Sequence, residues 1–146
     1  MIKYIIKIVC IFLSFSVNVN ANQINEMDTG TYELLTAQGQ PIGMKIRLSS
    51  KNNKWLMEGK DSSNIWKDLS CGKDCELKES SYDSSLVYLS KFPQYISRKS
   101  NISCIQNIAA AFCRVVPNNV AKDKWVYGYI ALVTGVPVLI PLRRID

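Results

Sequence analysis

The chain has 146 residues, of which 47% are hydrophobic, with 18 basic and 12 acidic residues and no His. Without His, a Ser-His-Asp or Cys-His catalytic arrangement is excluded within the chain. The basic residues do not cluster with aromatic residues on one element, so the positive charge does not indicate nucleic-acid binding.

The first 21 residues have the organisation of a signal peptide. Lys3 and Lys7 give a positive start, and residues 8–17 form an uncharged, mostly apolar run. Val19 and Ala21 are small enough for the −3 and −1 pockets of a signal peptidase, which predicts cleavage after Ala21. The apolar run is shorter than the ~20 residues of a membrane-spanning helix, which favours cleavage over a retained anchor.

The mature chain is then a single domain of residues 22–146, periplasmic or secreted. It keeps 16 basic and 12 acidic residues, a net charge of +4. It contains no further long apolar run, internal repeat or linker, so we expect one domain with no membrane-spanning segment. No glycine-rich phosphate loop, EF-hand spacing or zinc-ligand pattern occurs, and we expect neither a cofactor nor a metal.

Four cysteines follow the leader, and an even number in an oxidising compartment predicts two structural disulfides. Four cysteines allow three connectivities, and the spacing favours local pairs, Cys71 with Cys75 and Cys104 with Cys113. The segments on either side of the first pair, 65–70 and 76–80, read as the strands of a hairpin. A Cys-x3-Cys spacing differs from the Cys-x-x-Cys of thiol oxidoreductases, which argues against redox chemistry.

The first half of the mature chain is typical of an antiparallel β domain. Short extended segments alternate with turns rich in Gly, Asn, Ser and Pro. Met44, Ile46 and Leu48 alternate with Lys45 and Arg47, the period of a strand with one wet face. The predicted strands of this half span residues 29–35, 44–48, 55–59 and 65–70.

The middle of the chain predicts one or two short helices. Asp83 or Ser84 is suited to cap a helix, and Pro93 ends it and can open a second turn. The apolar residues expected to face inward from this region are Leu86, Leu89, Phe92, Tyr95 and Ile96.

Residues 102–116 fit either a helix or a pair of strands. Ile102, Ile105, Ala109 and Phe112 lie at helical spacing. On a helix, however, Cys104 and Cys113 would lie about 13 Å apart, too far for a disulfide. We favour the strand pair, and this assignment depends on the Cys104–Cys113 disulfide.

The C-terminal part predicts a hairpin, with strands over 125–133 and 136–145. Pro137 and Pro141 lack the amide donor, which predicts that the second strand lies at a sheet edge. The expected fold is mainly β, with α+β as a possibility. It is a small antiparallel barrel or two-layer sandwich with one or two short helices in the middle and two disulfides.

Aromatic and basic residues are the candidate contact residues. Trp55, Trp66 and Trp125, with Tyr32, Tyr127 and Tyr129, would either line a ligand pocket or form the core. The pair Arg143 and Arg144 would meet an acidic partner or lie solvated at an edge.

The carboxylates Glu76, Glu79 and Asp83 form the densest acidic group in the chain. A glycosidase needs two carboxylates placed across a cleft. On a surface hairpin such side chains are more often solvated, so we predict no enzyme.

Several segments together resemble a group of small exported proteins of Gram-negative bacteria. These segments are GTYELL, GMKIRL, WLMEGK, the two cysteine pairs and the closing ALVTGVPVLIPLRRI. The resemblance covers essentially the whole mature chain and implies a periplasmic address, with no functional residue to transfer. The Gly-x-Tyr opening before meandering strands is also similar to lipocalin-like barrels.

Two functions follow as expectations. The first is a periplasmic protein-binding domain, such as an inhibitor or immunity protein acting on a toxin or cell-wall hydrolase, whose partner is another envelope or secreted protein. The alternative is a carrier of a small apolar or envelope-derived ligand in a β-barrel pocket.

Overall fold

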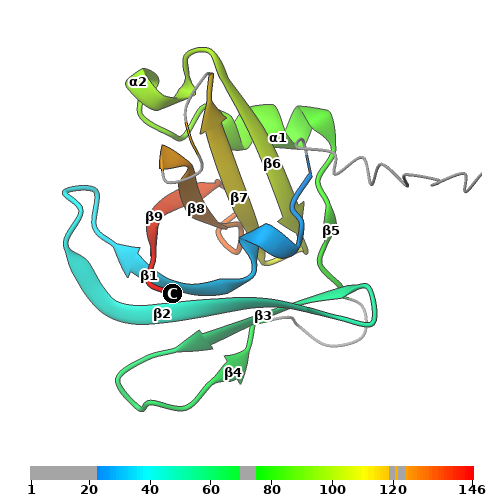
Figure 1. Cartoon of the computed structure of the whole chain (residues 1–146), viewed down its shortest axis with the longest axis vertical. Helices are drawn as coiled ribbons and strands as arrows, with labels where there is room; N and C mark the ends of the chain where they lie inside the picture. Colours follow the sequence, from blue (N-terminus) through cyan, green and yellow to red (C-terminus); the bar gives the residue numbers. More distant parts are fainter. Residues whose placement is uncertain (1–22, 70–74, 119–120, 122–123) are drawn as a thin grey trace, which may run out of the picture.

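A computed structural model describes residues 23–69, 75–118, 121 and 124–146, and its main feature is a nine-stranded antiparallel sheet (Figure 1). The strand order is β4-β3-β2-β1-β9-β8-β7-β6-β5. The strands are β1 Gly30–Leu35, β2 Pro41–Lys51, β3 Lys54–Lys60, β4 Lys67–Asp68, β5 Lys78–Glu79, β6 Ser100–Gln106, β7 Ala110–Pro117, β8 Val126–Ala131 and β9 Val138–Arg144. The prediction of a mainly β, antiparallel domain is therefore confirmed.

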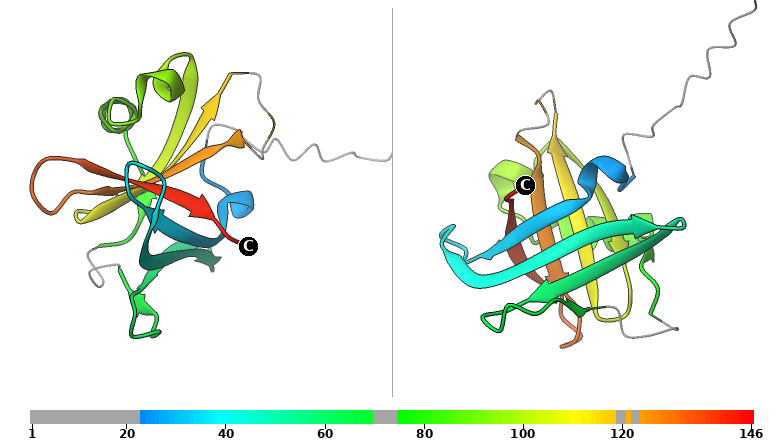
Figure 2. Two further views of the ribbon diagram at one scale, coloured as in Figure 1. Left: turned by 90° about the vertical axis from the view of Figure 1, so that its left-hand side faces the viewer. Right: turned by 60° about the horizontal axis from the view of Figure 1, so that its bottom comes forward.

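The sheet curls into a half barrel and does not split into two sheets. Strands β1–β3 run across one side of the molecule, and β6–β8 stand at a steep angle to them (Figures 1 and 2). An antiparallel bridge between Trp55 of β3 and Leu77, just before β5, joins the two ends of the curl. The strand edges outside this bridge, β4 and β5, are only two residues long each.

The concave face of the curl holds the larger apolar core. The period-two pattern of the strands turns Tyr32 and Leu34 of β1, Ile46 and Leu48 of β2, and Phe112 of β7 inward, where all are buried. The ring of Tyr32 lies 5.1 Å from that of Phe112 and 5.0 Å from that of Tyr127, centroid to centroid. These contacts join strands from both halves of the sequence.

A second core lies on the convex face of β6–β8, beneath two short helices (Figure 2). Helix α1 spans Tyr82–Leu89 and helix α2 spans Gln94–Ser97, which confirms one or two helices in the middle of the chain. Of the residues expected to face inward, Phe92, Leu89 and Ile96 join this core with Tyr88. The expectation was wrong for Leu86 and Tyr95, which are 43% and 84% exposed. A Cβ at Gly128 of β8 would come within 2.6 Å of the Phe92 ring, so glycine lets this segment pack closely.

The N-terminal cap of α1 is Ser81, whose side chain accepts a hydrogen bond from the backbone N–H of Ser84. The predicted caps, Asp83 and Ser84, were wrong by two to three residues. Ser81 has extended backbone angles, and its hydroxyl reaches one of the free N–H groups of the first turn. Asp83 instead lies inside that first turn.

The ambiguous stretch 102–116 is a strand pair. Strands β6 and β7 pair in register with Cys104 opposite Cys113, and a disulfide joins the two, with their Cα atoms 4.2 Å apart. Within the described residues this is the one disulfide with both cysteines placed. Cys75 is buried and disulfide-bonded, and Cys71, its predicted partner, lies outside the described residues.

Two predictions about strand neighbours were wrong. Strands β4 and β5 do not form a hairpin, because β4 pairs with β3 and β5 pairs with β6. Strand β9 is not an edge, because it lies between β8 and β1. Pairing of β9 with β1 covers only residues 142–144, so Pro141 lies just outside the doubly paired stretch, where a missing donor is tolerated.

Neither helix in the described ranges has the length and apolarity needed to cross a membrane.

Replacing Cys104 and Cys113 by Ser is expected to lower the free energy of unfolding by roughly 2–3 kcal/mol, because the crosslink restricts the unfolded chain. Urea unfolding of the oxidised protein and of the double variant measures the difference. An unchanged midpoint and slope would contradict the expectation.

Candidate functional site

The concave face has two ends that differ in character, and the first is closed by residues 23–28, called the N-terminal plug here. Its 3-10 helix η1, Glu26–Asp28, is held by a capping box. The Asn25 side chain accepts from the Met27 N–H, and the Asn25 N–H donates to Asp28 Oδ2 at 2.9 Å. This local bonding turns the Asp28 side chain toward the sheet.

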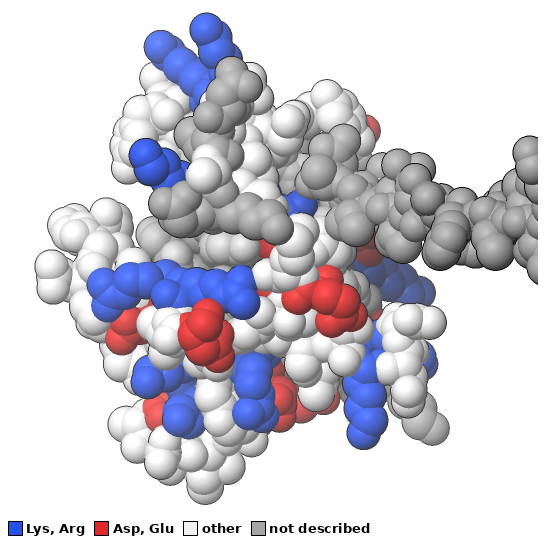
Figure 3. All heavy atoms as spheres, viewed as in Figure 1, with Lys and Arg blue, Asp and Glu red and all other residues white. Residues whose placement is uncertain are grey.

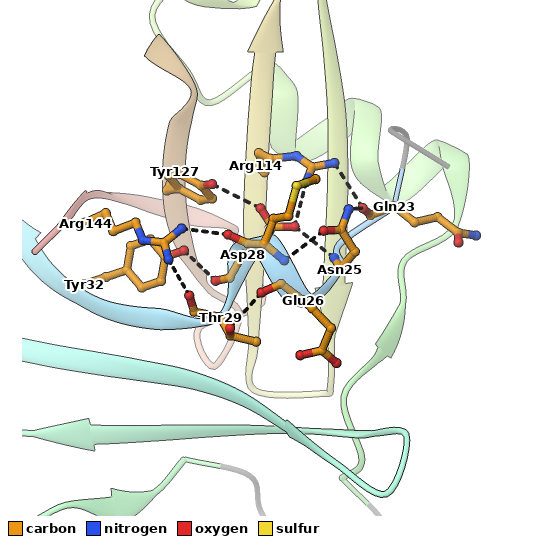
Figure 4. Close-up of polar contacts among 10 residues, drawn as sticks. Gln23, Asn25, Glu26, Asp28, Thr29, Tyr32, Arg114, Tyr127 and Arg144 are labelled. Atoms are coloured by element: carbon orange, nitrogen blue, oxygen red, sulfur yellow. Dashed lines mark hydrogen bonds and ion pairs between the residues drawn. The ribbon is translucent and has the colours of Figure 1, made fainter. Parts of the chain in front are cut away.

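A fully buried ion pair fastens the N-terminal plug to strand β7 (Figure 4). Arg114 Nη1 lies 2.6 Å from Asp28 Oδ2, and both side chains are 0% exposed. Tyr127 donates its hydroxyl to Asp28 Oδ1 at 3.1 Å, and Arg114 Nη2 donates to the Gln23 carbonyl at 3.0 Å. The guanidinium also lies 4.6 Å from the ring centre of Trp125.

Two tyrosines and a second arginine complete this network. Tyr32 donates its hydroxyl to the Asp28 carbonyl, and Arg144 donates to the carbonyls of Met27 and Thr29. Burial raises the pKa of both Tyr32 and Tyr127 above the ordinary value, and the nearby Asp28 carboxylate raises both further. Both hydroxyls therefore keep their protons and act as donors at neutral pH. The network binds the plug and leaves no exposed reactive group at Asp28.

The opposite end of the same strands holds an apolar pocket of about 230 Å³. Its floor and walls come from Leu34 of β1, Ile46 of β2, Tyr129 of β8 and Ile140 of β9, all of which also contact the inner core. The other lining residues are Ile42, Met44, Lys45, Gly59, Asp61, Ile65, Lys67 and Leu69. Gly59 contributes no side chain, and Leu69 packs against its backbone, since a Cβ at this position would come within 2.9 Å of the Leu69 side chain.

The rim of the apolar pocket exposes apolar side chains. Ile42, Met44 and Ile65 are 43%, 44% and 62% exposed. Isolated apolar side chains on a surface are ordinary, whereas these three lie together at the mouth of one hollow. Lys45, Lys67 and Asp61 supply the charges beside them.

The tryptophans singled out in the sequence do not lie together. Trp55 packs against the inner core and forms the bridge with Leu77. Trp66 stacks beneath Arg47 and Lys60, whose charged groups lie 4.5 and 4.9 Å from its ring centre. Neither lines the apolar pocket.

Trp125, Arg143 and Arg144 do share a hollow of about 440 Å³ beside the N-terminal plug. Arg143 pairs with Glu33 at 2.6 Å, and Arg144 donates to the carbonyls of Met27, Thr29 and Asp146. Basic and acidic side chains are interspersed on the face drawn in Figure 3. Both arginines therefore already have partners within the domain.

The carboxylates Glu76, Glu79 and Asp83 are exposed and do not face one another across a cleft lined by all three. Both oxygens of Glu79 accept from the Gln23 amide, at 3.1 and 3.0 Å. In the described part of the chain, no three His, Cys, Asp or Glu side chains are grouped to hold a metal ion.

Sequence reasoning missed Asp28 and Arg114, and of the residues that line the apolar pocket it named only Tyr129 as a candidate. Arg114 was detectable in principle, because it lies within the apolar run of β7 at an inward position, where a charge requires a partner. The pocket carried a weaker signal, the continuation of the alternating pattern of β2 back to Met44 and Ile42, beyond the buried part of the strand.

Comparison with protein-family models, with curated proteins and with solved structures gives no match for this chain.

Replacing Asp28 by Ala is expected to lower the free energy of unfolding by about 3–5 kcal/mol, because Arg114 stays buried without its counter-ion. Glu33→Ala is the matched control, since Glu33 pairs with an exposed arginine; it should cost about 0–1 kcal/mol. Urea unfolding measures both variants. Equal losses in the two would show that the buried pair does not hold the plug.

The raised pKa values of Tyr32 and Tyr127 predict alkaline destabilisation. Below about pH 10 both states keep the phenolic protons; above it the unfolded chain loses them first, so stability falls as pH rises. Tyr127→Phe should make this decline shallower, whereas Tyr95→Phe, at an 84% exposed position, should not. Urea midpoints between pH 8 and about pH 11 test this, and equal declines in both variants would refute it.

Proposed function

We propose that this domain is a non-enzymatic binding protein that holds the apolar part of a small amphiphilic ligand in the apolar pocket. The observation that carries the proposal is that pocket, about 230 Å³ in volume, at the end of the concave face opposite the N-terminal plug. Small-molecule sites are typically concave and mostly apolar, with a few polar groups that orient the ligand.

Burial of apolar surface would drive the binding. Ile42, Met44 and Ile65 each expose two fifths or more of their surface at the rim. Covering such surface is worth about 25 cal/mol per Å² removed from water. An acyl chain or similar group would contact these rim residues and the deeper Leu34 and Ile140.

The charges at the rim favour an anionic head group. Lys45 and Lys67 line the pocket together with one carboxylate, Asp61. The Ser63 side chain and the Ser63 N–H, the latter at 2.8 Å, donate hydrogen bonds to the Asp61 carboxylate, and these bonds lower the pKa of Asp61. The two lysines outnumber it, so the local field favours a carboxylate or phosphate head.

The leader predicted over residues 1–21 supports the cell envelope as the site of action. We propose that the ligand is envelope-derived and that the protein acts after export to the periplasm or medium. The resemblance to small exported proteins supports the same address.

An inhibitor or immunity protein that binds an envelope or secreted partner is the second candidate function. A specific observation favours it: within the described residues, part of the outer edge of strand β6 has no neighbouring strand, and exposed side chains of α1 lie beside it. The exposed apolar residues of that helix are Tyr82, Leu86 and Val87.

Calorimetric titration with dodecanoate tests the proposal on protein expressed from the full-length sequence. We expect 1:1 binding that Met44→Lys weakens about tenfold, because a charge replaces an apolar contact. Val133→Lys, at an exposed apolar position outside the pocket, should leave the affinity unchanged.

The preference for an anionic head group is tested by comparing dodecanoate with the uncharged dodecanol. The double change Lys45→Glu and Lys67→Glu should weaken dodecanoate by roughly fivefold while leaving dodecanol unaffected. No binding of either compound, or equal effects of Met44→Lys and Val133→Lys, would reject the pocket as the site. Sequencing the N-terminus of the purified protein shows in the same preparation whether it begins at Asn22, as export requires.

A further inference from the structure

The outer edge of strand β6 is covered by a neighbouring strand over only part of its length. Strand β5 pairs with Ile105 and Gln106, and the last bond on this side runs from the Ser80 N–H to the Cys104 carbonyl. Within the described residues, no strand pairs with the outer side of β6 before Cys104.

The register of β6 shows which backbone groups face that open edge. Cys104 and Cys113, with Cα atoms 4.2 Å apart, form a non-hydrogen-bonded pair of the β6–β7 ladder. The alternation then turns the N–H and C=O of Ile102 away from β7 as well, as the outward Cys104 carbonyl confirms. Ile102 therefore presents one donor and one acceptor at the edge.

Strand β5 ends before it reaches the part of the β6 edge that contains Ile102. Strand β5 would continue along β6 past Ser80, but Ser81 caps α1 and the helix leads away from the edge. A groove of about 330 Å³ lies where the strand would have continued. Its lining includes Ser85 and Leu86 of α1 and Ser100 and Ile102 of β6.

We propose that this edge binds an extended peptide segment of another protein, which adds a short strand to β6 in continuation of β5. The main chain of the peptide would pair with the N–H and C=O of Ile102, the mode of recognition known as β-augmentation. Its side chains would alternate between the α1 wall and solvent. This inference concerns the second candidate function and is independent of the apolar pocket.

The negative charge of Glu79, at one end of the groove, favours a peptide that carries a basic residue. The Glu79 carboxylate lines the groove and accepts hydrogen bonds from the neutral Gln23 amide. No Lys or Arg of the described ranges forms an ion pair with Glu79. A peptide with a basic residue beside Glu79 and a small or apolar one facing Leu86 and Leu89 fits this groove.

A random eight-residue peptide display library, selected on the oxidised protein made from the full-length sequence, supplies the probes. The enriched peptides are synthesised, their affinities measured by fluorescence anisotropy, and their contacts mapped by backbone amide NMR. We expect a basic residue in the enriched sequences and a shift of the Ile102 amide on binding. Dodecanoate should not compete.

Ile102→Pro removes the N–H of residue 102, which points away from β7. The hydrogen bonds between β6 and β7 remain, because on either side of this residue they are formed by Asn101 and Ser103. The substitution should weaken the peptides about tenfold or more, since their carbonyl loses its partner, whereas Ile102→Val should not. If the proline variant does not fold, Leu86→Lys at an exposed groove position replaces it, with the same expected loss. Met44→Lys, in the apolar pocket, should have no effect.

Three outcomes would overturn the inference. The first is a selection that enriches no peptide above the protein-free control. The second is a set of amide shifts that lie away from β6 and α1. The third is peptide affinity that neither Ile102→Pro nor Leu86→Lys changes.

Discussion

A salt bridge between two fully buried side chains, Asp28 and Arg114, constrains how this chain is arranged. A guanidinium on an inward position of a strand costs several kcal/mol to desolvate unless it meets a carboxylate with further hydrogen bonds. The capping box of η1 and the hydroxyl of Tyr127 provide those bonds to Asp28. The N-terminal segment is therefore bound across the end of the concave face, 86 residues from its partner in sequence.

Filling one end of the curled sheet leaves the two ends with different chemistry. At the plug, polar groups are buried and paired, and Arg144 adds bonds to the carbonyls of Met27 and Thr29. At the far end, the buried Leu34 and the half-buried Ile140 line the base of a hollow with an apolar rim. The buried polar network stabilises the fold at the plug, and the apolar pocket at the other end is available to a ligand. Strands β1, β8 and β9 contribute residues to both ends.

What the sequence predicted correctly depends on local physics. The 3.6-residue geometry of a helix is incompatible with a Cys104–Cys113 disulfide, and the strand pair was confirmed. The alternation of Ile46 and Leu48 with charged residues gave the inner face. The wrong predictions concern which strands, distant in sequence, become neighbours. Whether β9, with its Pro141, lies at an edge depends on its pairing with β1, which the local sequence does not reveal. Asp28 became a candidate only once the fold placed Arg114 beside it, and the apolar pocket exists only through the curl.

Native mass spectrometry of the protein, purified under mild conditions from the cells that produce it, tests directly whether the open end of the sheet binds a ligand. We predict a 1:1 adduct with one class of anionic amphiphile, released by organic solvent and absent from the Met44→Lys protein. A protein that carries no adduct, with its disulfide oxidised and its fold intact, would contradict the claim that the open end of the sheet is a ligand site.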